Sequence, residues 1–217
     1  MESTKTRILK KLLETDGYLS GQELCEQLGV SRTAVWKYMK QLKEEGYEIE
    51  AVQNKGYCLK DVPDVLGESE IKSRLHTRWA GQTLYYYDEI DSTNTQIKRL
   101  AEEDAPHGTL AVADYQSRGK GRRGRAWDSP HGSAIYMSIL FRPEIRPDRA
   151  SMLTLVIGLS VTQAIRSNLG LQAQIKWPND VVLNGKKLVG ILTEMSAQMN
   201  YIEYLVTGIG INANLRE

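Results

Sequence analysis

The sequence predicts an α+β protein of two domains, and three features lead to this prediction. Before residue 47, apolar residues recur at helical spacing in three short segments. Two short apolar strands around a glycine turn follow them. Beyond residue 66, strand-like apolar runs are interspersed with amphipathic helical segments. A chain of 217 residues has room for two such domains, which we place at residues 1–62 and 66–217.

Composition argues against a membrane-spanning protein, a secreted protein and a protein with an overall basic surface. Hydrophobic residues make up 41% and charged residues 25% of the chain, as in ordinary globular proteins. The formal net charge is only +1, so anion binding must come from local clusters of cations. We see no apolar run that could span a bilayer and no signal peptide. Cys25 and Cys58 lack metal-ligand spacing, which predicts free thiols and a cytoplasmic protein without a metal site or membrane partner.

The first domain has the pattern of a winged helix-turn-helix. The first helix covers Thr4–Thr15, Ser20 followed by Glu23 is a capping-box start for the second, and Ser31 caps the third. The tight Gly-Val-Ser turn between the second and third helices makes them a helix-turn-helix. A predicted hairpin with its turn at residues 54–56 supplies the wing.

DNA is the partner that this module most often binds. Five residues lie off the apolar stripe of the third helix or at the wing tip, and we expect them to contact bases or phosphates: Arg32, Thr33, Trp36, Lys37 and Lys55. Protein binding is the alternative, because winged helices also serve that role. The presence of Trp36 does not by itself distinguish between a side chain packed in the core and one that contacts DNA.

The second domain alternates strands and helices. Strands are expected at residues 83–87, 109–113, 134–141 and 201–207, and helices from Ser69 toward Trp79, at 95–103 and at 149–168. The last helix, capped by Asp148, is apolar nearly all round, which predicts burial in the core. Asn184-Gly185 between apolar runs predicts a type I′ hairpin. Pro178 makes residues 177–180 a turn.

The densest charge in the chain lies in the loop from Gly119 to Trp127. Three glycines and four cations fall within seven residues, which indicates a nearby anion such as phosphate. The glycines spell G-x-G-x-x-G after a strand, but residues 128–132 read as a turn instead of the helix that a dinucleotide site needs. We therefore reject a dinucleotide fold. A solvated basic loop is the alternative for an isolated charge run.

Other polar signals are ambiguous when each is taken singly. Asp91-Ser92-Thr93-Asn94 precedes a helix, where it serves either as an N-cap or as a polar receptor for a ligand. Gly208 and Gly210 alternate along a strand, which indicates close approach of a ligand or of a packed element. The three histidines form no catalytic pairing, and we interpret them as structural.

Together these motifs resemble those of the bifunctional biotin protein ligases that also repress biotin operons. The resemblance covers the whole chain and rests on five motifs in family order: Ser92-Thr93-Asn94, Gln116 with the Gly119–Trp127 loop, Lys176-Trp177-Pro178-Asn179-Asp180, Lys187–Leu192 and Gly208–Asn212. It implies a class II synthetase-like mixed β-sheet domain with helices after the winged helix. It also implies that ATP and biotin form biotinyl-5′-AMP, from which biotin passes to a lysine of the biotin carboxyl carrier protein.

The resemblance assigns roles to residues of this sequence. Arg122, Lys187 and Asp180 are implied in catalysis: Arg122 closes over the intermediate, Lys187 meets carboxylate or phosphate, and Asp180 orients or deprotonates the incoming lysine. Mg²⁺ is expected with ATP. The residues implied in binding biotin or its adenylate are Ser92, Thr93, Asn94, Gln116, Gly119, Lys120, Gly121, Arg122, Trp127, Lys187, Gly190, Gly208, Gly210 and Asn212.

Regulation and length raise further expectations. If adenylate orders the basic loop, the ordered surface favours a homodimer that places two winged helices on operator DNA. Members of the family usually continue past Asn212 into more catalytic domain and an SH3-like barrel, so the chain is expected to be truncated; a fragment and a naturally short form both fit. Two alternatives are a biotin-sensing regulator without ligase activity and a lipoate or octanoate ligase. The basic loop and the winged helix favour biotin.

Overall fold

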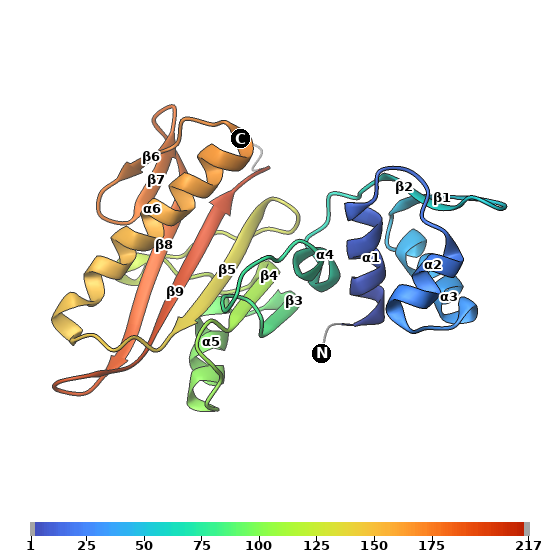
Figure 1. Cartoon of the computed structure of the whole chain (residues 1–217). Coiled ribbons are helices and arrows are strands. Elements are labelled where there is room, and N and C mark those ends of the chain that lie inside the picture. Colours follow the sequence, from blue (N-terminus) through green and yellow to red (C-terminus); the bar gives the residue numbers. More distant parts are fainter. Residues whose placement is uncertain (1–2, 215–217) are drawn as a thin grey trace. The chain divides into compact units, whose positions relative to one another are not determined.

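The computed structural model describes residues 3–214, and the chain divides into two compact units after His76 (Figure 1). The sequence placed the boundary between residues 62 and 66. The difference arises because helix α4 (Glu68–Ser73) packs on helix α1 (Thr4–Glu14) of the first unit. The buried hydroxyl of Tyr47 donates a hydrogen bond to Glu70 Oε2 at 2.6 Å, which fixes α4 to that unit.

The first unit is the predicted winged helix. Helices α1, α2 (Gly21–Leu28) and α3 (Arg32–Glu44) precede a hairpin of β1 (Glu48–Val52) and β2 (Gly56–Asp61). Serine side chains accept backbone N–H groups at the start of all three helices, which satisfies donors that the helix leaves open. The core that holds them together is formed by Ile8, Leu9, Leu24, Val35 and Leu42, all at most 2% exposed.

A seven-stranded mixed sheet forms the second unit, in the order β3-β4-β5-β9-β8-β7-β6. Among the strands of residues 3–214, β3 and β4 are the only parallel neighbours. The strands are β3 (Leu84–Ile90), β4 (Leu110–Gln116), β5 (Ala134–Phe141), β6 (Gln174–Lys176), β7 (Asp180–Leu183), β8 (Lys186–Ala197) and β9 (Ile202–Asn212). The three-residue strand β6 was not predicted.

Helices α5 (Thr93–Glu102) and α6 (Ala150–Leu169) cover opposite faces of this sheet. Ile97 of α5 packs in a cluster with Val206 of β9, whereas Ile165 of α6 packs in another with Ile209. Side chains alternate between the faces of a strand, so the even and odd positions of β9 face different helices. Gly208 and Gly210 therefore lie on the face that carries α5. Figure 1 shows α6 extending over β6, β7 and β8.

The hairpin between β7 and β8 has the predicted turn. Asn184 and Gly185 have φ angles of 50° and 79°, the left-handed values that a type I′ turn requires at both central positions. The turn pairs Leu183 with Lys186, and an irregularity in the register between Val181 and Val182 then brings Gly190 of β8 opposite Asp180 of β7.

Three expectations about the helices were wrong. The helix expected from Ser69 toward Trp79 ends at Ser73. Asp148 does not cap α6, because it forms an ion pair with Arg146 at 2.7 Å in the short 3₁₀ turn Pro147–Arg149 that comes before α6.

The third correction concerns the burial of α6. Only one side of the helix packs on the sheet, and Met152 and Val156 on the other side are 60% and 53% exposed. The segment Pro147–Leu169 is long and apolar enough to cross a membrane by length and composition alone, a test that helices packed on a sheet also pass.

Candidate active site

Three glycines form a flat floor on the face of the sheet that carries α5. Gly190 and Gly210 are paired across β8 and β9. The indole of Trp127 covers both: a Cβ on Gly210 would lie 2.7 Å from Trp127 Cε2, and one on Gly190 would be closer still. At Gly208, a Cβ would collide with the amide of Asn94. The predicted close approach is therefore made by two side chains of the protein itself.

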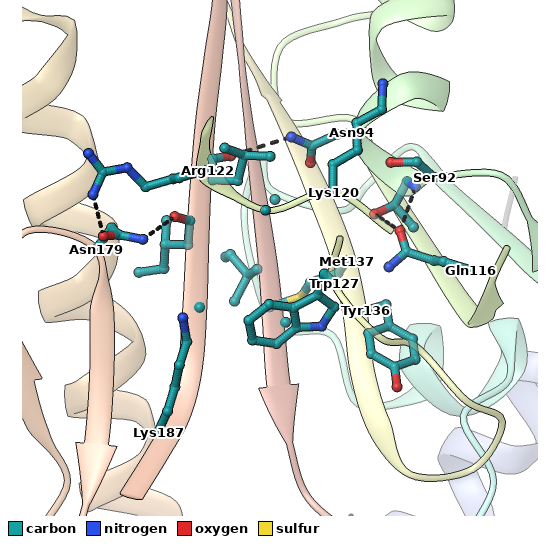
Figure 2. A pocket seen from close by; sticks show the side chains of 18 residues that line it. Ser92, Asn94, Gln116, Lys120, Arg122, Trp127, Tyr136, Met137, Asn179 and Lys187 are labelled. Carbon is teal, nitrogen blue, oxygen red and sulfur yellow. Dashed lines mark hydrogen bonds between the residues drawn. The ribbon is translucent and has the colours of Figure 1, made fainter. Parts of the chain in front are cut away.

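Figure 2 shows the pocket above this floor, which encloses about 60 Å³ between α5, the basic loop and strands β4, β5, β8 and β9. All but two of the residues implied in binding biotin or adenylate line it. The exceptions are Gly119 and Asn212. Gly119 lies at the base of the loop, where a Cβ would meet Trp127 O, and Asn212 Nδ2 donates to Lys187 O at 3.1 Å.

Hydrogen bonds join the start of α5, the end of β4 and the loop. Gln116 Oε1 accepts from Thr93 N at 2.8 Å, and Gln116 Nε2 donates to Ser129 Oγ at 3.0 Å. Ser129 Oγ in turn donates to Trp127 O at 3.1 Å. The amide of Gln116 is thereby fixed, and one of its two N–H bonds remains for a ligand.

Ser92 sits at the N-cap of α5, yet its hydroxyl makes no capping hydrogen bond. The residue is 2% exposed and lines the pocket, and among residues 3–214 its hydroxyl has no partner. Asp91 Oδ1 accepts from Ser92 N at 2.7 Å and forms an ion pair with Arg99 through Oδ2. The Ser92 hydroxyl therefore does not act as the N-cap acceptor that was one interpretation of this motif, and it is available to a ligand.

The basic loop folds back on itself. Trp127 N donates to Gly119 O at 2.9 Å and Gly121 N to Arg125 O at 2.7 Å, so both ends are tied. Between them Arg122–Gly124 form a single 3₁₀ turn, which agrees with the rejection of a dinucleotide fold. At the tip, the exposed guanidinium of Arg122 donates from Nη1 to Asn179 Oδ1 at 2.6 Å.

A second hollow of about 310 Å³ adjoins the pocket and is lined by cations of the loop together with Lys187 and Asp180. Lys187 Nζ lies 2.7 Å from Asp180 Oδ1, an ion pair by distance that lacks the geometry of a directed hydrogen bond. The same ammonium lies 5.0 Å from the centre of the Trp127 ring, within range of a cation–π interaction. In the described part of the chain, no group of three or more His, Cys, Asp or Glu residues has the arrangement of a metal site.

The sequence placed Asn179 in a motif of the family without giving it a role, and it did not single out Ser138 or Glu194 as functional residues. Asn179 connects Arg122 to the sheet, because its Nδ2 donates to Ile191 O at 3.1 Å. Ser138 is fully buried and Glu194 is half-buried, both on the face of the sheet that carries α5. Ser138 in β5 and Glu194 in β8 are polar residues within largely apolar strands, and this pattern could have identified them from the sequence.

The five residues expected to contact DNA are all exposed on the first unit. Trp36 is 61% exposed, so it does not pack into the core of the winged helix. Arg32 Nη2 donates to Gln22 Oε1 at 2.8 Å, which holds the guanidinium at the start of α3.

Comparison with known proteins agrees with both units. Residues 86–212 match the biotin/lipoate A/B protein ligase family, and residues 4–58 match a helix-turn-helix domain. The chain is 46% identical to the bifunctional ligase/repressor BirA of Bacillus subtilis (strain 168) over 99% of its own length and 66% of that protein. It is 36% identical to the protein of the same name from Escherichia coli (strain K12), over 94% of this chain and 62% of that one.

Solved structures of biotin protein ligases resemble part of the chain. The Aquifex aeolicus enzyme in complex with biotin and ATP superposes with a TM-score of 0.52 at 39% identity, over 63% of this chain and 54% of that chain. The Leishmania major enzyme in complex with biotinyl-5-AMP superposes with a TM-score of 0.55 at 25% identity, over 63% of this chain and 59% of that chain. The chain spans 66% or less of the length of these curated relatives. It belongs to the biotin/lipoate A/B protein ligase family and carries a helix-turn-helix domain ahead of the ligase domain.

Proposed function

We propose that this chain is an ATP-dependent biotin protein ligase that forms biotinyl-5′-AMP, transfers biotin to a lysine of a biotin carboxyl carrier protein, and represses transcription in response to biotin. One observation carries the ligase proposal. The pocket carries neutral hydrogen-bonding groups from α5 and β4 at one end, and at the other it shares Arg122, Trp127 and Lys187 with a hollow lined by cations. Biotin has the same division, with a neutral ureido ring at one end and a carboxylate at the other.

The inner end of the pocket suits the ureido group. A urea both donates and accepts hydrogen bonds, and the Ser92 hydroxyl can do either. The second N–H of Gln116 offers a donor for the ureido oxygen. The indole of Trp127, flat on Gly190 and Gly210, supplies an apolar wall for the ring system. Its Nε1 is buried without an acceptor in residues 3–214 and is a further donor for a ligand.

At the outer end, cations suit adenylate formation. When the biotin carboxylate attacks the α-phosphate of ATP, two anions must approach and pyrophosphate must leave. Lys187 and Arg122 line both hollows, so their charges lie where the carboxylate and phosphate would meet. Asp180 holds Lys187 through the ion pair. It is also the carboxylate of this hollow that an incoming lysine of the carrier would encounter.

Mg²⁺ would accompany ATP and would neutralise charge on its phosphates. Asp180 is the carboxylate that lines the outer hollow, and Lys187 already pairs with it. The donor set therefore suits a metal that arrives with the nucleotide and keeps most of its water ligands, as Mg²⁺ commonly does.

The basic loop would retain the intermediate. A mixed anhydride of carboxylate and phosphate reacts readily with water, so a site that makes one must exclude solvent before transfer. The loop is tied at Gly119 and Trp127, while its tip is held by the contact of Arg122 with Asn179. Opening at the tip would admit substrates and release products.

The repressor role rests on the first unit. Residues of α3 and the wing present cations and Trp36 to solvent, as a recognition helix requires. We expect adenylate to favour a homodimer, because a dimer places two winged helices on two operator half-sites. Localisation in the cytoplasm stays a prediction from the sequence.

Incubation with biotin, ATP, Mg²⁺ and a carrier-protein domain tests the ligase proposal. Biotinyl-5′-AMP and biotinylated carrier, both measured by mass spectrometry, are the expected products. Adenylate without transfer would support a biotin-sensing regulator, and octanoyl or lipoyl transfer in place of biotin would support the other alternative. Operator binding measured with and without biotin plus ATP tests the repressor role; affinity that ignores the ligand contradicts it.

A further inference from the structure

A chain of hydrogen bonds crosses the back of the pocket beneath the groups that face a ligand. It connects Glu194, Asn94, Ser138, Thr93 and Gln116, and we refer to these five residues as the polar chain. Asn94, Ser138 and Thr93 are at most 4% exposed. Figure 2 labels two members of this chain, Asn94 and Gln116, on the side of the pocket opposite Asn179 and Lys187.

Glu194 fixes the orientation of the Asn94 amide. Its Oε1 accepts from Lys98 Nζ at 2.6 Å and its Oε2 from Asn94 Nδ2 at 2.8 Å. Burial alone raises the pKa of the Glu194 carboxyl, but the hydrogen bonds from Lys98 and Asn94 hold this pKa below its usual range. The group is therefore a carboxylate at neutral pH. A carboxylate only accepts hydrogen bonds, so Asn94 must turn its NH₂ toward Glu194 and its Oδ1 toward Ser138. The carbonyl of Leu192 also accepts from Asn94 Nδ2, but at 3.4 Å this contact is much longer than the 2.8 Å bond to Glu194.

The orientation of Asn94 then decides where the hydroxyl protons lie. Ser138 Oγ is 2.6 Å from Asn94 Oδ1 and 2.7 Å from Thr93 Oγ1, but a hydroxyl has one proton. Asn94 Oδ1 has none, so Ser138 must donate to it. The Thr93 hydroxyl then has two acceptors within reach, Ser138 Oγ at 2.7 Å and Gln116 Oε1 at 3.1 Å, and the shorter contact favours donation to Ser138. The opposite assignment would leave two acceptor oxygens 2.6 Å apart. Thr93 N donates to Gln116 Oε1 in either case, but in the opposite assignment the Thr93 hydroxyl proton would turn from Ser138 to Gln116 Oε1 or to the pocket.

This direction gives Thr93 a defined polarity toward the pocket that it lines. With its proton directed at Ser138, Thr93 Oγ1 has only lone pairs left and accepts a hydrogen bond. The biotin ureido ring carries N–H groups that can donate to it. Octanoate and lipoate have hydrocarbon and dithiolane ends that offer no such donor.

We propose that Glu194 is a positioning residue that, through Asn94 and Ser138, keeps Thr93 a hydrogen-bond acceptor and thereby selects ligands with an N–H group. The inference rests on biotin being the ligand and adds a residue that determines specificity without touching it. A carboxylate at position 194 sets the polarity of a hydroxyl three hydrogen bonds away.

The isosteric substitution Glu194→Gln tests the proposal, because it preserves volume but allows the Asn94 amide to reverse. We expect the Kd for biotin, measured by calorimetry, to rise about tenfold, as the loss of one hydrogen bond to a neutral group predicts. The KM for ATP should change less than about twofold. Glu203→Gln is the matched control: Glu203 on β9 is also held by two side chains, Ser196 and Gln198, and lines neither hollow. An unchanged Kd for biotin in E194Q overturns the proposal.

The double variant E194Q/N94D separates proton direction from simple packing. It exchanges the amide and the carboxylate, so that an oxygen again faces Ser138 and an NH₂ group again bridges positions 94 and 194. We expect the Kd for biotin to return to within about threefold of that of the unmodified protein. A double variant that melts normally but binds no better than E194Q contradicts the proposal.

Ser138→Ala interrupts the polar chain at a second point. It tests the same proposal even if E194Q fails to fold. It should weaken biotin binding by about the same factor, and E194Q/S138A should bind no more weakly than either single variant, because both cut one chain. Additive losses would contradict coupling through Ser138.

A ligand-free measurement distinguishes this inference from the function on which it rests. In nitrogen–proton NMR spectra, E194Q should shift the side-chain amide resonances of both Asn94 and Gln116, and Glu203→Gln should shift neither. If the unmodified protein binds no biotin but E194Q shifts Gln116, the ligase proposal fails and the polar chain stands. If the Gln116 resonance does not move, the polar chain is rejected whether or not biotin binds.

Discussion

The indole of Trp127 lies so close to Gly210 that any side chain there would displace it: a Cβ on Gly210 would come within 2.7 Å of Trp127 Cε2. Gly210 pairs with Gly190 across β8 and β9, and the indole covers both. The wall of the candidate site is thus held in place by the absence of two side chains. Trp127 in turn ends the basic loop, so its position also sets the position of the loop.

We expect Gly210→Ala to reduce kcat/KM for biotin more than about tenfold, because the indole must move from the floor of the pocket. Expressed as a free energy, this loss in kcat/KM should exceed any decrease in the free energy of unfolding measured by thermal denaturation. Gly158→Ala is the control, since a Cβ on Gly158 of α6 meets only Ile191 Cδ1, at an ordinary 3.7 Å. Replacing a mid-helix glycine by alanine is expected to leave kcat/KM unchanged and to stabilise by about 0.5–1 kcal/mol. Full activity in G210A would contradict the role of the floor.

Arg122 should retain the adenylate. Its guanidinium reaches from the tip of the loop to Asn179, across the opening between the two hollows. We expect Arg122→Gly to accelerate release of biotinyl-5′-AMP about 10- to 100-fold, which corresponds to about 1.5–3 kcal/mol for hydrogen bonds to a charged group. Release is measured by chasing labelled adenylate from the protein. Arg146→Gly, which removes a surface cation paired with Asp148, should leave the release rate unchanged.

Asp180 should affect transfer more than adenylate formation. The ion pair with Lys187 at 2.7 Å orients an ammonium that adenylate formation needs, but the carboxylate itself repels phosphate. We expect Asp180→Asn to slow transfer to the carrier lysine more than about tenfold and adenylate formation less than about threefold, measured in separate single-turnover assays. Lys187→Gln should show the reverse pattern. Equal losses in both steps for D180N would contradict a role in transfer.

Features that depend on neighbouring residues could be predicted from the sequence. The winged helix follows from serines that cap their own helices, and the β7–β8 hairpin from Asn184-Gly185. Each of these residues acts on backbone within a few positions of itself, so no knowledge of the sheet was needed. Most of the implied pocket residues came from the family resemblance, and the structure brings them together around one pocket.

Features that depend on distant residues could not be predicted. Glu194 contacts Lys98 and Asn94 across about a hundred residues, and only the order of strands in the sheet brings them together. The burial of α6 was overestimated because an apolar sequence does not reveal that only one side of the helix meets the sheet. The register of β8 against β9, which pairs Gly190 with Gly210, is likewise a property of the whole sheet.

The Asp91–Arg99 ion pair should make stability depend on pH. Burial alone raises the pKa of the Asp91 carboxyl, but hydrogen bonds from Arg99 and from Ser92 N outweigh it and lower the pKa from the ordinary value of 3.8. A depressed pKa in the folded state stabilises the protein above the unfolded pKa, and this contribution is lost as pH falls below about 4 and through the folded value. Both side chains are partly exposed, so the contribution should be below about 1 kcal/mol.

Unfolding by urea as a function of pH measures this contribution. Asp91→Asn should be less stable than the unmodified protein at pH 7, and the difference should shrink as pH falls below 4. Asp148→Asn is the comparison for a more exposed pair: the hydrogen bond from Arg146 also lowers the pKa of Asp148, and solvent screening should make its effect smaller. A difference between D91N and the unmodified protein that stays constant down to pH 2 would contradict the linkage.

Lys37 should contribute to DNA affinity mainly through charge. It is exposed in the second turn of α3, and Arg32 and Trp36 belong to the same surface expected to face DNA. We expect Lys37→Ala to weaken binding to all duplexes by a similar factor and to reduce the slope of log K against log salt by about 1, as loss of one phosphate contact predicts. Lys40→Ala removes a cation from the same helix that is paired with Glu44 at 3.7 Å, and should leave the slope unchanged. Fluorescence anisotropy at several salt concentrations measures both variants; equal slopes for K37A and the unmodified protein would place Lys37 outside the DNA interface.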